Sequence, residues 1–254
     1  PIPCGQGTAA MISAALAVTD YLGLDAPQVV LAGDTGTGDG SQKVYWYLIE
    51  NIKNLQPQVL ALHYWMPDLE LMRSLYKTVE SLDKRPVLIA DAASMYAAKA
   101  TGLAPGFDLF TPDTSEIAFL ADQEAIHPAY IDKHLFELDS DRNPDLIEMA
   151  YQYKGAARIL LVKGREDIIA DRNGIIGSID GPDLPAMECI GGTGDSITGM
   201  CAALAYSGMA IEQAAITSAK VNRIAGQLAA VNPASGISAV IEQIPAALAK
   251  EMQV

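Results

Sequence analysis

Positive charge is scarce in this sequence. Its 254 residues include 17 lysines and arginines against 31 aspartates and glutamates, which gives a net charge of −14. A surface this acidic repels nucleic-acid backbones and anionic membranes, so neither is an expected partner. Any phosphate-bearing ligand must therefore be held by local features such as backbone amides, one lysine or a metal ion.

Long apolar runs and paired cysteines are lacking as well. No apolar run reaches the roughly 18 residues of a transmembrane helix, and the N-terminus lacks the regions of a secretory signal. The cysteines, Cys4, Cys189 and Cys201, have no metal-ligand spacing, and we interpret them as reduced thiols of a cytoplasmic protein. Half of the residues are hydrophobic and 19% are charged, as in globular proteins.

Short apolar strands alternate with helices along most of the chain. Strands are expected at about 28–32, 58–62, 86–90, 108–110 and 158–162, and an Asn-Gly pair at 173–174 predicts a hairpin of 167–170 with 175–179. Helices are expected at about 8–22, 42–53, 68–82, 93–100, 200–208, 210–228 and 235–249. A further helix opens at Thr111–Glu116, with Glu116 in its first turn, and runs to about Asp122, and a mostly helical region over 123–155 is broken at Pro128 and Pro144. This pattern predicts a three-layer α/β/α fold with a mainly parallel central sheet, as a single domain over residues 1–254.

Several polar or glycine-containing loops follow the expected strands. Ligands of parallel sheets bind beyond the carboxyl ends of the strands, so these loops are expected to converge on one rim. The loop at Gly33–Ser41 is rich in glycine, but it lacks the lysine of a Walker motif and carries Asp34 and Asp39, which repel phosphate. We expect it to line a pocket for the non-phosphate part of a substrate, with a surface turn as the alternative. The aromatic residues from His63 onward suit a flat ligand or ordinary packing.

A second glycine-rich turn, Glu188–Gly199, runs into an apolar helix and is the centre of the prediction. Its sequence is Glu-Cys-Ile-Gly-Gly-Thr-Gly-Asp-Ser-Ile-Thr-Gly. The first amides of a helix have no intrahelical partner and attract anions. A carboxylate beside them, Asp195, either caps the helix, takes a proton from a substrate hydroxyl or holds a metal.

The ordered set of Asp91, Thr111-Pro-Asp-Thr-Ser-Glu116, Leu161-Val-Lys-Gly164 and Gly191-Gly-Thr-Gly-Asp-Ser196 resembles the ribokinase-like superfamily. Within it, the set is most similar to ADP- or ATP-dependent NAD(P)H-hydrate dehydratases, a carbohydrate-kinase-like family. The resemblance covers roughly residues 85–228, with a weaker likeness at 5–22. Asp-Thr-Ser replaces the family's His-Pro-Gly, the opening strand of the family is missing, and Asp183-Leu-Pro-Ala-Met-Glu replaces an asparagine- and glycine-rich stretch. These departures fall on the substrate side.

The resemblance implies a role for each motif. Asp195 would be the base, and Lys163, Gly164, Gly192, Thr193, Gly194 and Asn222 would bind ATP or ADP. Glu116, with Asp91, would hold Mg2+ or its waters, or these two side chains would cap helices. Substrate contacts are expected from Gly33, Asp34, His63, Asp91, Thr111 and Asp113.

Three functions are consistent with these residues. The first is a dehydratase that phosphorylates the hydroxyl of NAD(P)H hydrate and eliminates phosphate. The second is a small-molecule kinase that acts on a sugar or vitamin-precursor alcohol and keeps its phosphorylated product. The third is a non-catalytic nucleotide-binding protein, which the presence of both Asp195 and Lys163 argues against. The apolar composition and short helices also predict a homo-oligomer.

Overall fold

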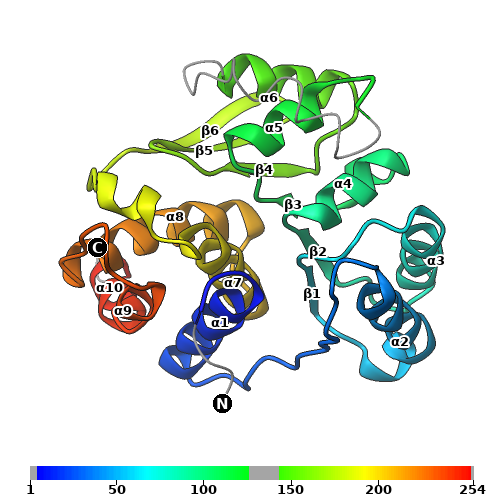
Figure 1. Ribbon diagram of the computed structural model, residues 1–254, viewed down its shortest axis with the longest axis horizontal. Helices are drawn as coiled ribbons and strands as arrows, with labels where there is room; N and C mark the ends of the chain where they lie inside the picture. The colour runs from blue at the N-terminus through cyan, green and yellow to red at the C-terminus, as the bar shows by residue number, and fades with distance from the viewer. Residues whose placement is uncertain (1–4, 126–142, 253–254) are drawn as a thin grey trace. The chain divides into compact units, whose positions relative to one another are not determined.

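The computed structural model describes residues 5–125 and 143–252 (Figure 1). It divides into two compact units, each considered by itself below. The first unit comprises Pro1–Gln28 and Leu161–Val254, and the second comprises Val29–Leu160. The single domain over residues 1–254 therefore stays a prediction, and the break predicted at Pro128 lies outside the described residues. No helix in the described ranges is long and apolar enough to cross a membrane.

The strands form a six-stranded sheet in the order β1-β2-β3-β4-β5-β6. Four of them pair in parallel, namely β1 (Val59–Leu62), β2 (Val87–Ala90), β3 (Leu109–Phe110) and β4 (Ile159–Val162). The other two, β5 (Asp167–Asp171) and β6 (Gly174–Ile179), form the antiparallel hairpin that the Asn-Gly pair predicts. The predicted α/β class with a mainly parallel sheet is thus confirmed.

The second unit also contains helices, and the first of them precedes β1. They are α2 (Asp39–Leu55), α3 (Leu69–Glu80), α4 (Ala93–Ala100), α5 (Thr114–Ala121) and α6 (Asn143–Gln152), with a 3₁₀ turn, η1, at Ala104–Gly106. Helices α2 and α3 lie side by side (Figure 1). Pro144 lies in the first turn of α6, where its fixed φ suits the start of a helix.

The strand predicted at 28–32 is wrong. This segment is neither helix nor strand, and its Val29 and Leu31 are 42% and 55% exposed. An apolar run becomes a strand only where another strand forms a hydrogen-bonded ladder with it. In the part of the chain that the structure describes, β1 is an edge strand and pairs with β2 alone.

The first unit is mostly helical beyond its hairpin. It contains α1 (Thr8–Leu22), η5 (Pro185–Cys189, a 3₁₀ helix), α7 (Thr193–Tyr206), α8 (Ile211–Leu228), α9 (Ile237–Ile241) and α10 (Ile244–Glu251). Helix α1 matches its prediction and ends at Gly23, whose φ of 67° closes it. The helix predicted over 235–249 is divided into α9 and α10, because Pro245 starts a new helix and cannot continue one.

Helices α1 and α7 pack backbone against backbone (Figure 1). The contact centres on Gly199 in α7, since a Cβ placed there would lie 2.1 Å from the Met11 carbonyl oxygen and 2.9 Å from its carbon. Real Cβ atoms do not approach this closely, so the two helices can meet only because residue 199 has no side chain.

Replacing Gly199 by alanine should destabilise the protein. The added methyl group would force the α1 backbone away, and overpacking of this kind costs about 1–3 kcal/mol in the free energy of unfolding. Urea denaturation measures the loss. Gly5→Ala is the matched control, because a Cβ at Gly5 meets nothing within 4 Å. Equal stability of the two variants would contradict a backbone contact at Gly199.

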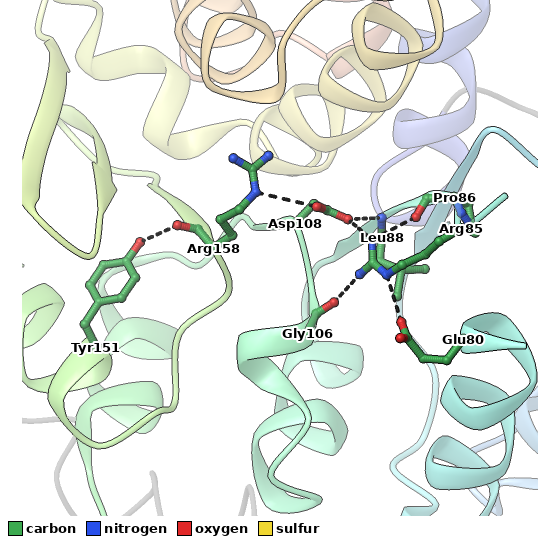
Figure 2. Close-up of polar contacts among 8 residues, drawn as sticks. All are labelled: Glu80, Arg85, Pro86, Leu88, Gly106, Asp108, Tyr151 and Arg158. Atoms are coloured by element: carbon green, nitrogen blue, oxygen red, sulfur yellow. Dashed lines mark hydrogen bonds and ion pairs between the residues drawn. The ribbon is translucent and has the colours of Figure 1, made fainter.

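The amino ends of the parallel strands in the second unit are joined by an ionic network centred on Asp108 (Figure 2). One carboxylate oxygen accepts hydrogen bonds from Arg85 at 2.7 Å and from the Leu88 amide at 2.8 Å. The other lies 3.6 Å from Nε of Arg158, and Arg85 also donates to Glu80 at 2.8 Å. Asp108 thereby connects the starts of β2, β3 and β4, at the amino ends of these strands.

Asp108→Asn should lower stability without changing the strand order. The substitution removes the negative charge between Arg85 and Arg158, and hydrogen bonds to charged groups are worth about 1.5–3 kcal/mol each. Thermal unfolding should show a lower Tm than for Asp83→Asn, which removes an exposed carboxylate from the same unit. A loss no larger than that of Asp83→Asn would show that the network contributes nothing.

Candidate functional site

In the first unit, the glycine-rich turn leads directly into α7. Gly192 is the N-cap residue, with φ of 104° and ψ of −10°, a conformation that glycine adopts without strain. Because Gly192 has no side chain, no N-cap side chain satisfies the first amides of α7. The Thr193 amide makes a long contact of 3.5 Å with the Ile190 carbonyl. Together with the Gly194 amide and the positive end of the helix dipole, it forms the kind of group that binds a phosphate.

Asp195 lies in the first turn of α7, as predicted, and its carboxylate has a partner outside that helix. Its Oδ2 accepts a hydrogen bond of 2.9 Å from the amide of Gly7. Gly7 is the N-cap of α1, so the packing of α1 on α7 positions the Asp195 carboxylate. The contact of the loop before α1 with Asp195 was not predicted.

Lys163 lies beside this turn. A Cβ placed on Gly194 would be 3.3 Å from Cδ of Lys163 and 3.4 Å from its Nζ. The structure therefore brings together Lys163, Gly194 and the start of α7, three features that the sequence assigned to nucleotide binding. An ammonium group beside the first amides of a helix concentrates positive charge where phosphate oxygens would bind.

Two further side chains support the start of α7. The Thr193 hydroxyl donates to the Ile190 carbonyl at 3.1 Å, so it is directed toward the preceding turn. The buried Ser196 hydroxyl lies 2.7 Å from the Thr193 carbonyl and 2.9 Å from Oδ1 of Asn222 on α8. Asn222 is 4% exposed, and it thereby links α8 to the first turn of α7.

A buried ion pair between Arg223 and Asp167 lies next to Gly164 and was not predicted from the sequence. Nε of Arg223 lies 2.8 Å from Oδ2 of Asp167, and their residues are 8% and 3% exposed. Burial raises the pKa of Asp167, and the positive charge of Arg223 opposes that rise. The sequence did contain a signal for this ion pair. Asp167 starts an apolar hairpin and Arg223 lies in an apolar helix, and a charged residue buried in such a segment requires a partner of opposite charge.

In the second unit, three predicted side chains follow neighbouring strands in one row. The register aligns Leu62 with Ala90 and Ala90 with Phe110. His63, Asp91 and Thr111 directly follow these three aligned residues. All three are buried, with 5%, 2% and 0% of their surface exposed. Nε2 of His63 lies 3.8 Å from Oδ2 of Asp91. The predicted convergence at the strand ends is thus found for these three residues.

The backbone turns sharply behind two members of this row. Tyr64 follows His63 with φ of 54°, and Ala92 follows Asp91 with φ of 51°. Positive φ is costly for residues other than glycine, and such residues cluster at functional sites. The Asp91 carboxylate accepts a hydrogen bond of 2.8 Å from the Ala92 amide and so stabilises this turn.

Asp113 and Glu116 form a capping box at the start of α5. The Asp113 side chain accepts hydrogen bonds of 2.8 Å from the amides of Ser115 and Glu116, and Glu116 accepts one of 2.8 Å from the Asp113 amide. Oε1 of Glu116 also lies 3.5 Å from the hydroxyl of Tyr96. Burial, followed by the charge of Glu116, raises the pKa of Tyr96, so its hydroxyl keeps its proton and can donate to this oxygen. Glu116 therefore caps the start of α5, which is one of the two roles that the sequence left open for it.

Asp34 holds the loop before α2 together. It accepts hydrogen bonds of 3.0 Å from the amides of Gly36, Gly38 and Ser41, and the Ser41 amide is the largest of the causes that hold its pKa well below the usual range. Gly33 lies against α2, since a Cβ on Gly40 would be 2.2 Å from the Gly33 carbonyl oxygen. Substrate contacts by Gly33 and Asp34 remain predictions.

Comparison with known proteins agrees with the resemblance seen in the motifs. Residues 51–245 match the model of the Carb_kinase family, described as NAD(P)H-hydrate dehydratase. An uncharacterized protein of Methanocaldococcus jannaschii is 38% identical over 238 residues, which cover 94% of this chain and 98% of that protein. A bifunctional NAD(P)H-hydrate repair enzyme of Pyrobaculum aerophilum is 32% identical over 178 residues, 69% of this chain but 32% of the longer enzyme.

Solved structures show the same fold at low identity. A ribokinase-like superfamily protein of Enterococcus faecalis is 16% identical, with a TM-score of 0.60 over 95% of this chain and 82% of that one. The pyridoxal kinase of Staphylococcus aureus, in complex with AMP-PCP and pyridoxal, is 15% identical, with a TM-score of 0.59 over 87% and 83% of the two chains. The predicted ribokinase-like fold is confirmed, and the chain belongs to the NAD(P)H-hydrate dehydratase family.

Proposed function

We propose that this protein is a nucleotide-dependent dehydratase that repairs NAD(P)H hydrate. The observation that carries the proposal is the start of α7, where a glycine N-cap, the Asp195 carboxylate and Lys163 occur together. The family match and the repair enzyme of P. aerophilum support the same reaction.

The proposed reaction has two steps, and the first needs positioning and charge stabilisation more than covalent chemistry by the protein. Asp195 accepts the proton of the substrate hydroxyl while the hydroxyl oxygen forms a bond to the γ-phosphorus of ATP or the β-phosphorus of ADP. The bond from that phosphorus to the rest of the nucleotide breaks, and ADP or AMP leaves. The amides of Thr193 and Gly194 stabilise the charge that develops on the phosphoryl oxygens. In the second step the electron pair of the ring nitrogen expels phosphate, which leaves with the electrons of the C–O bond. The neighbouring ring carbon then gives up a proton to the phosphate or to water, its C–H electrons form the carbon–carbon double bond of NAD(P)H, and the electron pair returns to the nitrogen.

The remaining first-unit residues would bind the nucleotide. Lys163 would place its charge on the phosphates, with Gly164 allowing the backbone to approach them. Asn222, held against Ser196, would keep α8 in place beside the start of α7. In the second unit, the proposal assigns substrate contacts to the strand-end and loop residues Gly33, Asp34, His63, Asp91, Thr111 and Asp113.

Glu116 is the proposed Mg2+ ligand, directly or through water. Its carboxylate accepts a hydrogen bond from the Asp113 amide and lies 3.5 Å from the Tyr96 hydroxyl, and carboxylate oxygens are the ligands that Mg2+ prefers. Bound Mg2+ would neutralise charge on the nucleotide phosphates. The residues present therefore fit the ion that the family resemblance implies.

A kinase that retains its phosphorylated product is the second candidate. It is favoured by the replacement of His-Pro-Gly by Asp113-Thr-Ser115 on the substrate side, and by the pyridoxal kinase among the structural neighbours. Phosphorus NMR separates the two candidates, because the dehydratase releases orthophosphate whereas the kinase accumulates a phosphoester.

Asp195→Asn should abolish turnover and leave nucleotide binding intact or tighter. The amide cannot take the proton, which costs about 10²–10⁴ in kcat, and it removes a negative charge near the phosphates. Coupled assays of ADP or AMP formation and calorimetric titration with nucleotide measure the two effects. Glu242→Gln, which removes an exposed carboxylate from the same unit, should change neither. Full activity of Asp195→Asn would rule out its role as the base.

Glu116→Gln should weaken Mg2+ dependence while keeping the fold. Glutamine also completes a capping box, so Tm should stay near that of the wild type, whereas the Mg2+ concentration for half-maximal activity should rise about tenfold. Glu116→Ala should both lower Tm, because the capping box is lost, and raise the Mg2+ concentration for half-maximal activity. Glu124→Gln removes an exposed carboxylate of the same unit and serves as the control. An unchanged Mg2+ profile in Glu116→Gln would leave Glu116 with its capping role alone.

A further inference from the structure

The Arg223–Asp167 pair needs an explanation beyond stability. A buried ion pair pays a desolvation cost that its attraction only partly recovers, and apolar side chains of similar size often serve as well or better. Arg223 is on α8, directly after Asn222, and is 8% exposed, so its guanidinium must find all its partners inside the protein. Those partners show what the pair does.

Arg223 and Asp167 form hydrogen bonds with the carbonyl and the amide of Gly164, respectively. The guanidinium donates to the Gly164 carbonyl at 3.0 Å and to the Arg165 carbonyl at 2.8 Å. Oδ1 of Asp167 accepts a hydrogen bond of 3.1 Å from the Gly164 amide. Its Oδ2 faces Nε of Arg223 at 2.8 Å. Both peptide groups of Gly164 are therefore fixed by one buried pair.

The fixed glycine is the residue after Lys163. Lys163 is partly exposed and Gly164 is exposed, so packing alone does not determine the path of the chain beyond β4. The direction in which the Lys163 side chain leaves the backbone depends on the peptide that joins it to Gly164. That side chain must run beside Gly194 to bring its ammonium group to the start of α7.

We infer that Arg223 and Asp167 are positioning residues that aim Lys163 at the phosphates of the bound nucleotide. The inference rests on the proposed function, because it gives Lys163 a phosphate to contact. Neither residue touches the nucleotide in this account, and each acts through the Gly164 backbone. Arginine is needed because its planar fork reaches a carboxylate and the carbonyl oxygens of Gly164, Arg165 and Asp180 at once, which a lysine cannot do.

The test replaces both charges together. Removing one partner leaves an unpaired buried charge and risks unfolding, whereas Asp167→Leu combined with Arg223→Met keeps an apolar filling. Calorimetry should show that this double variant binds ADP about tenfold more weakly, the scale of one charge-assisted contact, while adenosine affinity stays within about twofold. Arg172→Met, which removes an exposed arginine of the hairpin turn, should leave both affinities unchanged.

Lys163→Met provides the second arm of the test. If the pair acts through Lys163, adding Lys163→Met to the double variant should cause no further loss of ADP affinity beyond that of Lys163→Met alone. Additive losses would overturn the inference, as would a double variant that folds and binds ADP normally. An equal loss of adenosine and ADP affinity would also overturn it, because the pair would then support the whole fold.

A measurement without nucleotide separates this inference from the proposed function. Reductive ¹³C-methylation labels the lysines, and Lys163→Arg identifies the NMR signal of Lys163. In the double variant that signal should move while signals of the other lysines stay, and an unchanged Lys163 signal would contradict positioning. If the wild-type protein binds no nucleotide, the proposed function fails, and the Lys163 signal still decides whether the pair positions that side chain.

Discussion

The first unit depends on the close approach of two helix backbones. Gly199 lets α1 lie against α7, and the amide of Gly7 at the start of α1 then donates to the Asp195 carboxylate. Helix α1 also approaches Gly192 at the start of α7, where a Cβ would lie 3.1 Å from Cβ of Ala10. A side chain at Gly199 would therefore disturb both the packing and the proposed base. The fold and the chemistry of this unit share one steric constraint.

The second unit depends on the register of its parallel strands. Because aligned residues precede His63, Asp91 and Thr111, the three side chains share one edge of the sheet. The opposite edge is held by Asp108 and its two arginines (Figure 2). Ionic contacts thus secure the amino ends of the strands, and the carboxyl ends carry the strained turns at Tyr64 and Ala92. This division suits a sheet whose ligands bind beyond the carboxyl ends.

Most of the fold could be predicted from local patterns. Helix α1 and the β5–β6 hairpin were predictable because a terminal glycine and an Asn-Gly turn act within a few residues. The segment at 28–32 misled the prediction, since strand formation requires a partner that the local sequence does not specify. The turn at Gly192–Asp195 was recognisable as a motif. The contacts of Gly7 with Asp195 and of Arg223 with Gly164 join residues distant in sequence, so no local pattern could predict them.

The absorbance of NADH at 340 nm tests the central claim most directly. The wild-type protein is incubated with Mg2+, NADH hydrate and either ATP or ADP. We expect a rise in absorbance that requires a nucleotide, and the nucleotide that supports it is the phosphoryl donor. No rise with either nucleotide would contradict the dehydratase. In that case, nucleotide binding seen by thermal shift would favour the kinase, and a lack of binding would favour a non-catalytic protein.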